Sequence, residues 1–313
     1  MEILIIGGTG IVGTAAANKA AIEHEVTVLA PDFPQRDQFI PGVKFFCTGK
    51  GDPFFEPIVQ SITPPKGWDC VVDIYSFSEE HARITSEVPS DQFIVFSTSL
   101  VYERSNTPDS IPSSQPIAET PPSGYASRKL DVERLWRSTN HNWTLLRPYH
   151  ILGPNSYLGC LPFHNRDPYI VERINNEQQL NLVNDVQFNA IHPNDLAEII
   201  LRCIGNKNTF QKAYNAVNPK PILTADYFKE IAKQLNKPLN INRVPNTCNN
   251  GWALTAQNHL YDTSDLETDI QYTPNTSIET CIADSLRVHP PLMPAEETAV
   301  HQRMNIRPWP CEL

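Results

Sequence analysis

The sequence predicts an α/β protein built on a doubly wound parallel sheet, and three observations lead to that prediction. A run of branched apolar residues at 3–6 passes directly into a glycine-rich turn, strand-like and helix-like segments alternate up to about residue 150, and polar residues follow the predicted strand ends. In such a sheet the ligand site lies at the carboxyl ends of the strands. We therefore expect the functional residues at that edge.

The first predicted strand and the turn after it give the strongest single signal. Residues 3–6 are apolar in succession, which indicates burial on both faces, because a half-exposed strand would alternate. Glycines at three-residue spacing follow, and the alanine-rich segment 14–20 favours a helix. In a dinucleotide-binding loop one glycine permits the tight turn, another lets the backbone approach a pyrophosphate, and a third lets the helix pack on the strand. An ordinary strand-to-helix turn is the alternative. The predicted cofactor contacts in this loop are Gly7, Gly8, Thr9, Gly10, Ile11, Val12 and Gly13.

The composition of the 313 residues bounds the class of protein. A formal net charge of −10 opposes nonspecific binding to nucleic acid or anionic lipid. The seven cysteines are scattered without a Cys-x-x-Cys pair, which predicts reduced thiols and neither a disulfide framework nor a zinc site. We expect no signal peptide before the strand that starts at residue 2, and no apolar run is long enough to cross a membrane. These features predict a cytoplasmic protein with no nucleic-acid partner, no membrane partner and no metal.

The end of the second predicted strand, at 25–30, is where this kind of fold selects its cofactor. An acid there holds the ribose hydroxyls of NAD, whereas an arginine accommodates the 2′-phosphate of NADP. Asp32 comes slightly late for the first role and also fits a plain turn, while Arg36 is available for the second. NADP and NAD both remain open as the cofactor, with a lean to NADP.

Further strands are predicted at 44–47, 68–75 and 92–99, with helical stretches between them. Additional cofactor contacts are expected at or after the ends of these strands and of the sixth strand. They are Asp52, Tyr75, Ser97 and Pro148.

Tyr125 and Lys129 lie four residues apart at the head of a helix predicted to run to about residue 137. This spacing places both side chains on one helix face, where an ammonium group can stabilise a phenolate. A surface helix with an ordinary tyrosine and lysine is the alternative. Thr98 and Ser99 close the strand that precedes this helix.

Several motifs occur together and in order. The chain resembles the extended short-chain dehydrogenase/reductase family, the NAD(P)-dependent epimerases, dehydratases and reductases, over about residues 1–285. It looks most similar to atypical members, whose fourth strand reads Val-Asp-Ile-Tyr, as at 72–75. The motifs are the glycine triplet, residues 97–102, the pair Tyr125 and Lys129, residues 147–154 and residues 191–197.

The resemblance implies roles for the polar residues at the sheet edge. Tyr125 would be the general acid/base, and Lys129 would bind the nicotinamide ribose and lower the pKa of the tyrosine. Thr98 would orient the reacting oxygen, with Ser99 as the alternative if the strand end is shifted by one residue. A phenol of pKa about 10 is a poor base at neutral pH until a cation beside it favours the phenolate. The hydride would be transferred to or from the nicotinamide ring of the cofactor.

The same resemblance narrows the substrate through departures from the family pattern. Sugar-nucleotide members hold the diphosphate with arginines and with an asparagine after the sixth strand. Here His150 replaces the asparagine, Phe188 stands where an arginine is expected, and no arginine occurs between Arg243 and Arg287. The Asp-Glu pair of the 4,6-dehydratases is also absent after the active-site threonine. We expect a largely apolar pocket with a few polar anchors, lined by Tyr75, Thr98, Tyr125, Tyr149, His150, Phe188 and Trp252. Arg166 or Arg243 could supply one anionic contact, so a carboxylate substrate stays open.

Beyond residue 150 the strand-helix rhythm is interrupted. We expect a Rossmann-type NAD(P)-binding domain at 1–155 and a substrate-binding lid formed by 156–187 and 218–287. About residues 188–217 should complete the first domain: residues 188–203 return a strand and a helix to the main sheet, and residues 213–217 form its last strand. His192 and Asp195 should brace the junction of sheet and lid. The proline-rich tail at 288–313 is expected to run as an extended strap, with disorder as the alternative.

These observations predict an NAD(P)-dependent reductase or dehydrogenase that acts on a carbonyl or alcohol of a small, non-nucleotide substrate. An epimerase of a sugar or nucleotide sugar is one alternative, and release of NAD(P)H during turnover would separate the two. A noncatalytic cofactor- or RNA-binding family member is the other, against which the acidic charge and the intact Thr98, Tyr125 and Lys129 count. We expect a monomer or a homodimer.

Overall fold

The computed structural model describes residues 1–102, 110–115, 117–118, 124–158, 170–182, 185–243 and 258–288. Within these ranges the chain forms a seven-stranded sheet in the order β11-β6-β5-β4-β1-β2-β3. Neighbouring strands pair in parallel throughout, which confirms the predicted fold class. The strands are β1 (Glu2–Ile6), β2 (Glu25–Ala30), β3 (Lys44–Cys47), β4 (Cys70–Asp73), β5 (Phe93–Phe96), β6 (Trp143–Arg147) and β11 (Lys212–Asn215).

Helices cover both faces of this sheet, as the apolar run in β1 predicts. Ile3 and Ile5 point to a core shared with α1 (Ile11–Ala20) and α6 (Pro193–Cys203). Leu4 and Ile6 point the other way, to a core shared with helices from the β3–β4, β4–β5 and β5–β6 connections. These are α2 (Phe55–Ile62), α3 (Glu79–Ser86) and α4 (Gly124–Ser138).

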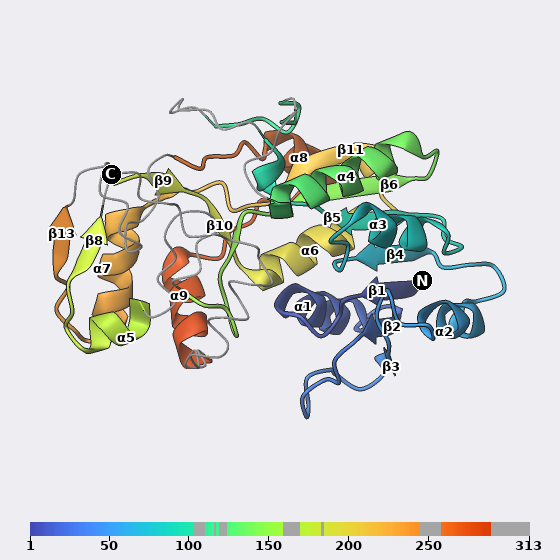
Figure 1. Ribbon diagram of the computed structural model, residues 1–313, viewed down its shortest axis with the longest axis horizontal. Coiled ribbons are helices and arrows are strands. Elements are labelled where there is room, and N and C mark those ends of the chain that lie inside the picture. Colours follow the sequence, from blue (N-terminus) through green and yellow to red (C-terminus); the bar gives the residue numbers. More distant parts are fainter. Residues whose placement is uncertain are drawn as a thin grey trace.

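A second group of elements lies beside the sheet along the long axis of the molecule (Figure 1). It is built on three short strand pairs and has a hydrophobic core of its own, and we call it the lid. The strand pairs are β7 (His150–Ile151) with β10 (Ala190–Ile191), β9 (Gln187–Phe188) with β12 (Ile222–Leu223), and β8 (Leu180–Leu182) with β13 (Ile241–Arg243). The helices are α5 (Ile170–Asn175), α7 (Thr224–Gln234) and α9 (Ile278–Arg287).

The structure corrects one prediction about the return of the chain after the lid insertion. The strand expected to rejoin the main sheet near residue 188 does not do so, because β9 and β10 pair with β12 and β7. The physical reason is that both positions beside β6 are already occupied, by β5 and β11. The predicted helix does return, and α6 packs against α1.

Polar contacts fasten the junction of sheet and lid near the start of α6, as predicted. The carboxylate of Asp195 accepts hydrogen bonds from the Tyr272 hydroxyl, at 2.7 Å, and from the Thr276 amide, at 3.1 Å. His192 Nε2 lies 3.3 Å from a carboxylate oxygen of Asp284 on α9.

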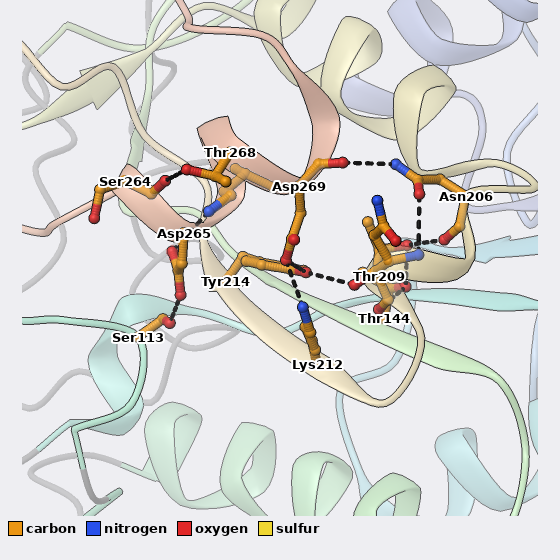
Figure 2. A network of polar contacts seen from close by, with 12 residues as sticks. Ser113, Thr144, Asn206, Thr209, Lys212, Tyr214, Ser264, Asp265, Thr268 and Asp269 are labelled. Atoms are coloured by element: carbon orange, nitrogen blue, oxygen red, sulfur yellow. Dashed lines mark hydrogen bonds and ion pairs between the residues drawn. The ribbon is translucent and has the colours of Figure 1, made fainter.

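A second polar network fixes α8 (Ser264–Ile270) to the edge strand β11 and to the 3₁₀ turn η2 (Lys207–Thr209), as Figure 2 shows. Asp269 Oδ2 accepts hydrogen bonds from the Tyr214 hydroxyl, at 2.5 Å, and from Lys212 Nζ, at 2.7 Å. Its backbone carbonyl accepts a hydrogen bond of 2.9 Å from Asn206.

Among the described residues, none of the helices has the length and apolar character that spanning a membrane requires.

Candidate active site

The glycine loop occupies the carboxyl end of β1 and leads into the N-terminus of α1. Gly10 is the N-cap residue of this helix, and its first turn carries no acidic side chain. The partial positive charge of the helix N-terminus is therefore open to an anion.

Packing within the protein explains Gly7, Gly8 and Gly13, but it does not explain Gly10. A Cβ atom on Gly8 would lie 2.4 Å from a Val28 methyl group, and one on Gly13 would lie 2.4 Å from the Gly7 carbonyl oxygen. A Cβ on Gly10 would meet nothing closer than that same oxygen, at 3.7 Å. The backbone at Gly10 is thus exposed beside a helix N-terminus, which fits the pyrophosphate of a dinucleotide.

The loop after β2 carries both candidates for cofactor selection, and both are exposed. Arg36 extends into solvent, with the exposed Asp37 carboxylate 3.7 Å away. Gln38 ties this loop to the glycine loop, because its amide donates to the Thr9 carbonyl at 2.8 Å and to the Thr14 hydroxyl at 2.7 Å. Asp32 and Arg36 therefore stand on a loop that is anchored at the predicted cofactor site.

The end of β4 holds a buried polar cluster that the sequence analysis missed. Lys50 Nζ lies 2.6 Å from Asp73 Oδ2, and both side chains are fully buried. The same carboxylate oxygen accepts hydrogen bonds from the hydroxyls of Ser76 and Thr85. Burial opposes ionisation of Asp73, but these donors, Lys50 above all, hold the pKa of the carboxyl below its ordinary value.

Aromatic side chains extend from this cluster toward the predicted catalytic pair. The Tyr75 ring stacks on His81, with centroids 5.7 Å apart, and meets the Phe77 ring edge-on at 5.0 Å. Phe77 in turn covers Lys129, whose ammonium lies 4.8 Å from the ring centroid, and its ring lies 6.5 Å from that of Tyr125. These contacts join the end of β4 to α4.

Tyr125 and Lys129 occupy successive turns of α4, and their surroundings differ. Lys129 is buried and donates a 2.7 Å hydrogen bond to the Phe96 carbonyl at the end of β5. Burial lowers its pKa to about 7, against the attraction of Asp73 and Glu133 and with the added repulsion of Lys50. Tyr125 is half-buried and packs against the lid core. The pair therefore lies where the sheet and the lid meet.

Thr98 and Ser99 differ in how their hydroxyls are used. The Ser99 hydroxyl donates to the Arg147 carbonyl at 2.8 Å, and its amide donates to the Pro148 carbonyl at 3.0 Å. Thr98 is the N-cap of the 3₁₀ turn η1 (Ser99–Val101), where its hydroxyl oxygen accepts a 3.4 Å contact from the Leu100 amide. The hydroxyl proton of Ser99 is committed to the backbone, so this arrangement favours Thr98 for the orienting role.

Ser97 belongs to a buried network between β5, β6 and α4. Its hydroxyl donates to Glu133 at 2.6 Å, and Arg147 makes two further hydrogen bonds to the same carboxylate. Arg147 also donates to the Tyr102 hydroxyl at 2.7 Å. The hydroxyl proton of Ser97 is thus used within the protein, so a contact from Ser97 to a cofactor would come from its other atoms.

The remaining predicted site residues divide between the sheet edge and the lid core. Asp52 is exposed after β3, and its carboxylate accepts a 2.9 Å hydrogen bond from the Phe54 amide. Tyr149 stacks on His259, with centroids 4.8 Å apart, and His150 meets Phe188 edge-on at 6.0 Å. Phe188 is 1% exposed and packs on Tyr227, so its ring is part of the lid core.

Trp252 and the tail at 289–313 lie outside the described residues.

Comparison with known proteins finds a family model that is similar to the segment carrying this site. Residues 80–216 match the model of the NAD dependent epimerase/dehydratase family. The matched segment carries Thr98, Tyr125 and Lys129, and the match confirms the resemblance predicted from the motifs.

A curated relative and several solved structures are also similar. The chain is 28% identical over 246 residues to the chloroplast stem-loop binding protein of 41 kDa b of Arabidopsis thaliana, covering 74% of this chain and 62% of the relative. The fold is similar to UDP-glucuronic acid 4-epimerase from Bacillus cereus, solved with NAD, with a TM-score of 0.70 and 16% identity over 91% of this chain and 97% of that one. The enzyme WbmG of Bordetella bronchiseptica, also solved with NAD, gives a TM-score of 0.71 and 17% identity over 92% and 94%. At this identity the structural matches show the fold.

Proposed function

We propose that the chain binds a nicotinamide dinucleotide at the carboxyl edge of the sheet. It would transfer hydride between this cofactor and a carbonyl or alcohol of a small, non-nucleotide substrate. The observation that carries the proposal is the position of Tyr125 and Lys129 on successive turns of α4, where the lid core meets the strand ends. The open backbone at Gly10 and the unblocked N-terminus of α1 support the cofactor.

The protein residues supply binding and proton transfer. Tyr125 gives a proton to, or takes one from, the reacting substrate oxygen, and Thr98 orients that oxygen with its hydroxyl. Lys129 contacts the nicotinamide ribose and favours the phenolate of Tyr125. The dinucleotide supplies the hydride when it is bound. NADP and NAD both fit, and Arg36 on the anchored loop after β2 favours NADP through a 2′-phosphate contact.

The substrate class follows from the cations of the lid. Its segment 218–286 contains one arginine, Arg243, which lies 3.7 Å from the Asp185 carboxylate, and its segment 156–187 contains Arg166 and Arg173. A diphosphate needs charge-assisted donors, so we propose an uncharged or weakly charged substrate. The lid, which consists mainly of residues 156–187 and 218–287, would cover the substrate, over a cofactor domain at 1–155 that about residues 188–217 complete. We further propose a cytoplasmic monomer or homodimer.

An epimerase acting on a sugar or nucleotide sugar is the second candidate, favoured by the description of the matched family. The test is to incubate the protein with NADPH or NADH and a panel of small aldehydes and ketones, and in parallel with NAD and UDP-glucose. Net oxidation of the reduced dinucleotide supports the reductase. Conversion of UDP-glucose to its 4-epimer without net reduction of NAD would replace it with the epimerase.

Stem-loop RNA binding is a further candidate, favoured by the name of the curated relative. The net charge of −10 opposes it, because phosphate contacts need clustered cations. Retention of a stem-loop RNA at low salt, together with absence of dinucleotide binding, would support this candidate against the proposed enzyme.

A further inference from the structure

Lys50 and Asp73 come from parts of the sheet that are not neighbours. Lys50 follows β3 and Asp73 ends β4, and the sheet order places β1 and β2 between those strands. The lysine side chain therefore reaches Asp73 across the carboxyl edge where the glycine loop begins. A buried ion pair contributes little net stability, because desolvation of both charges offsets their attraction. The main effect of this pair is on geometry.

The pair fixes the turn that follows β4 from both sides. Lys50 Nζ donates to the Ser76 hydroxyl oxygen at 2.9 Å and contacts the Tyr75 carbonyl at 3.3 Å. The other carboxylate oxygen of Asp73 accepts a 3.1 Å hydrogen bond from the Tyr75 amide. Both the amide and the carbonyl of Tyr75 are thus held by the ion pair.

The fixed turn contacts both parts of the proposed cofactor site, the glycine loop and Lys129. The Cβ atom of Tyr75 packs so closely on Gly7 that a Cβ atom there would lie 2.9 Å from it. Two residues further, Phe77 covers the Lys129 ammonium at 4.8 Å from its ring centroid. A shift of this turn would therefore displace the support of the glycine loop and the cover of the ribose-binding lysine together.

We propose that Lys50 and Asp73 are positioning residues for the nicotinamide dinucleotide, holding the 73–77 turn so that the glycine loop and Lys129 face one ligand. This inference rests on the proposed function. Neither residue contacts the reacting atoms, and both act through Tyr75 and Phe77.

The test compares dinucleotide affinity in variants that keep the buried region neutral. The double variant Lys50→Met/Asp73→Asn removes both charges. The side-chain oxygen of the asparagine can still accept the hydrogen bond from the backbone amide of Tyr75. The control Lys44→Met/Glu25→Gln removes an exposed ion pair of 2.9 Å at the opposite, amino edge of the same sheet. We expect the double variant to bind NADPH and NADH about tenfold more weakly, as measured by calorimetric titration, and the control to bind like the wild type.

Hydrogen exchange supplies a readout that does not depend on the ligand. Peptides that cover residues 72–78 and 5–10 should exchange faster in the double variant and not in the control. If the double variant does not fold, Ser76→Ala provides a milder change, because it removes only the hydroxyl that bonds both charged groups. We expect it to weaken binding about threefold.

Equal affinity and equal exchange in wild type and folded variants would overturn this inference and leave the proposed function intact. Absence of any dinucleotide binding by the wild type would instead contradict the proposed function, and with it the positioning role.

Discussion

Arg147 donates two hydrogen bonds to the Glu133 carboxylate, one of 2.6 Å from Nη2 and one of 2.7 Å from Nε. The side chain of Arg147 is 1% exposed and that of Glu133 is 0% exposed. Glu133 follows Lys129 by one turn on α4, and Arg147 ends β6. The pair therefore fixes the rotation of the helix that presents Tyr125 and Lys129 to the sheet edge.

Replacing Arg147 alone should be costly. Arg147→Met leaves the buried Glu133 with only the more distant Arg137 guanidinium, at 3.5 Å, and we expect the free energy of unfolding to fall by about 3 kcal/mol. Urea denaturation measures the loss. The double variant Arg147→Met/Glu133→Leu removes both charges and should recover most of it. A loss below about 1 kcal/mol in the single variant would show that the pair is not what holds α4.

Tyr125→Phe removes one hydroxyl and should reduce turnover by roughly two or more orders of magnitude, the range of a lost general acid or base. Cofactor affinity and unfolding should change little. The measurement is the rate of NADPH or NADH oxidation with the carbonyl compound that the panel identifies. The control is Tyr214→Phe, which also removes one hydroxyl. That hydroxyl donates to Asp269 and lies away from the carboxyl edge of the sheet, so this variant should keep full turnover. Near-normal turnover of Tyr125→Phe would assign the proton to another group.

Lys129 should make the protein less stable at low pH. Its pKa falls from 10.5 to about 7 on folding because it is buried, so between these values the unfolded chain binds a proton that the folded chain does not. Stability therefore rises with pH across that window, and below pH 7 the penalty is constant. Lys129→Met removes the penalty, and we expect it to be more stable than the wild type at pH 6 by roughly 2–4 kcal/mol.

Urea unfolding at pH 6 and pH 9.5 checks this expectation, and the difference between the two proteins should shrink at the higher pH. A difference that does not change with pH would contradict it. The same variant should bind the dinucleotide more weakly, so stability and affinity move in opposite directions.

Asp269 should contribute stability that is lost in acid. Burial opposes its ionisation, but the hydrogen bonds from Lys212 and Tyr214 outweigh burial and lower its pKa below the ordinary 3.8 (Figure 2). This contribution is present above about pH 4 to 5 and disappears as the pH falls through the folded-state pKa.

The variant Asp269→Asn isolates that contribution. It should lose about 1–2 kcal/mol at pH 7 and clearly less at pH 3, as measured by chemical denaturation. Asp226→Asn, in an exposed pair with Lys229, is the control and should lose less than about 0.5 kcal/mol. An equal loss at both pH values would argue against an ionised Asp269.

The periodic and glycine-rich parts of the chain allowed the fold to be predicted. Residues 3–6 and the turn after them predicted β1, α1 and the sheet class, because burial on both faces leaves a continuous apolar run. The strands predicted at 68–75 and 92–99 were too long at both ends. They end at Asp73 and Phe96, where the side chains of Asp73 and Ser97 enter polar networks at the edge of the sheet.

The polar clusters could not be predicted, because their members are distant in sequence and come from different elements. An aspartate in the apolar run of β4 was a visible signal for a buried partner, yet its partner Lys50 lies beyond two intervening strands. Arg147 was noted only as part of a motif, and its partner Glu133 follows from the position of α4 against β6. Spacing predicts which residues share one helix face, as for Tyr125 and Lys129, but not contacts between elements.

The most direct test of the central claim is a dinucleotide titration of the wild type beside Gly10→Val. A Cβ atom at Gly10 meets no protein atom closer than 3.7 Å, so this variant should fold normally, whereas Gly13→Ala would force a Cβ atom to within 2.4 Å of a backbone oxygen. We expect the wild type to bind NADPH or NADH and Gly10→Val to lose measurable binding with an unchanged melting curve. Unchanged affinity in Gly10→Val, or no binding by the wild type, would contradict a dinucleotide site at the glycine loop.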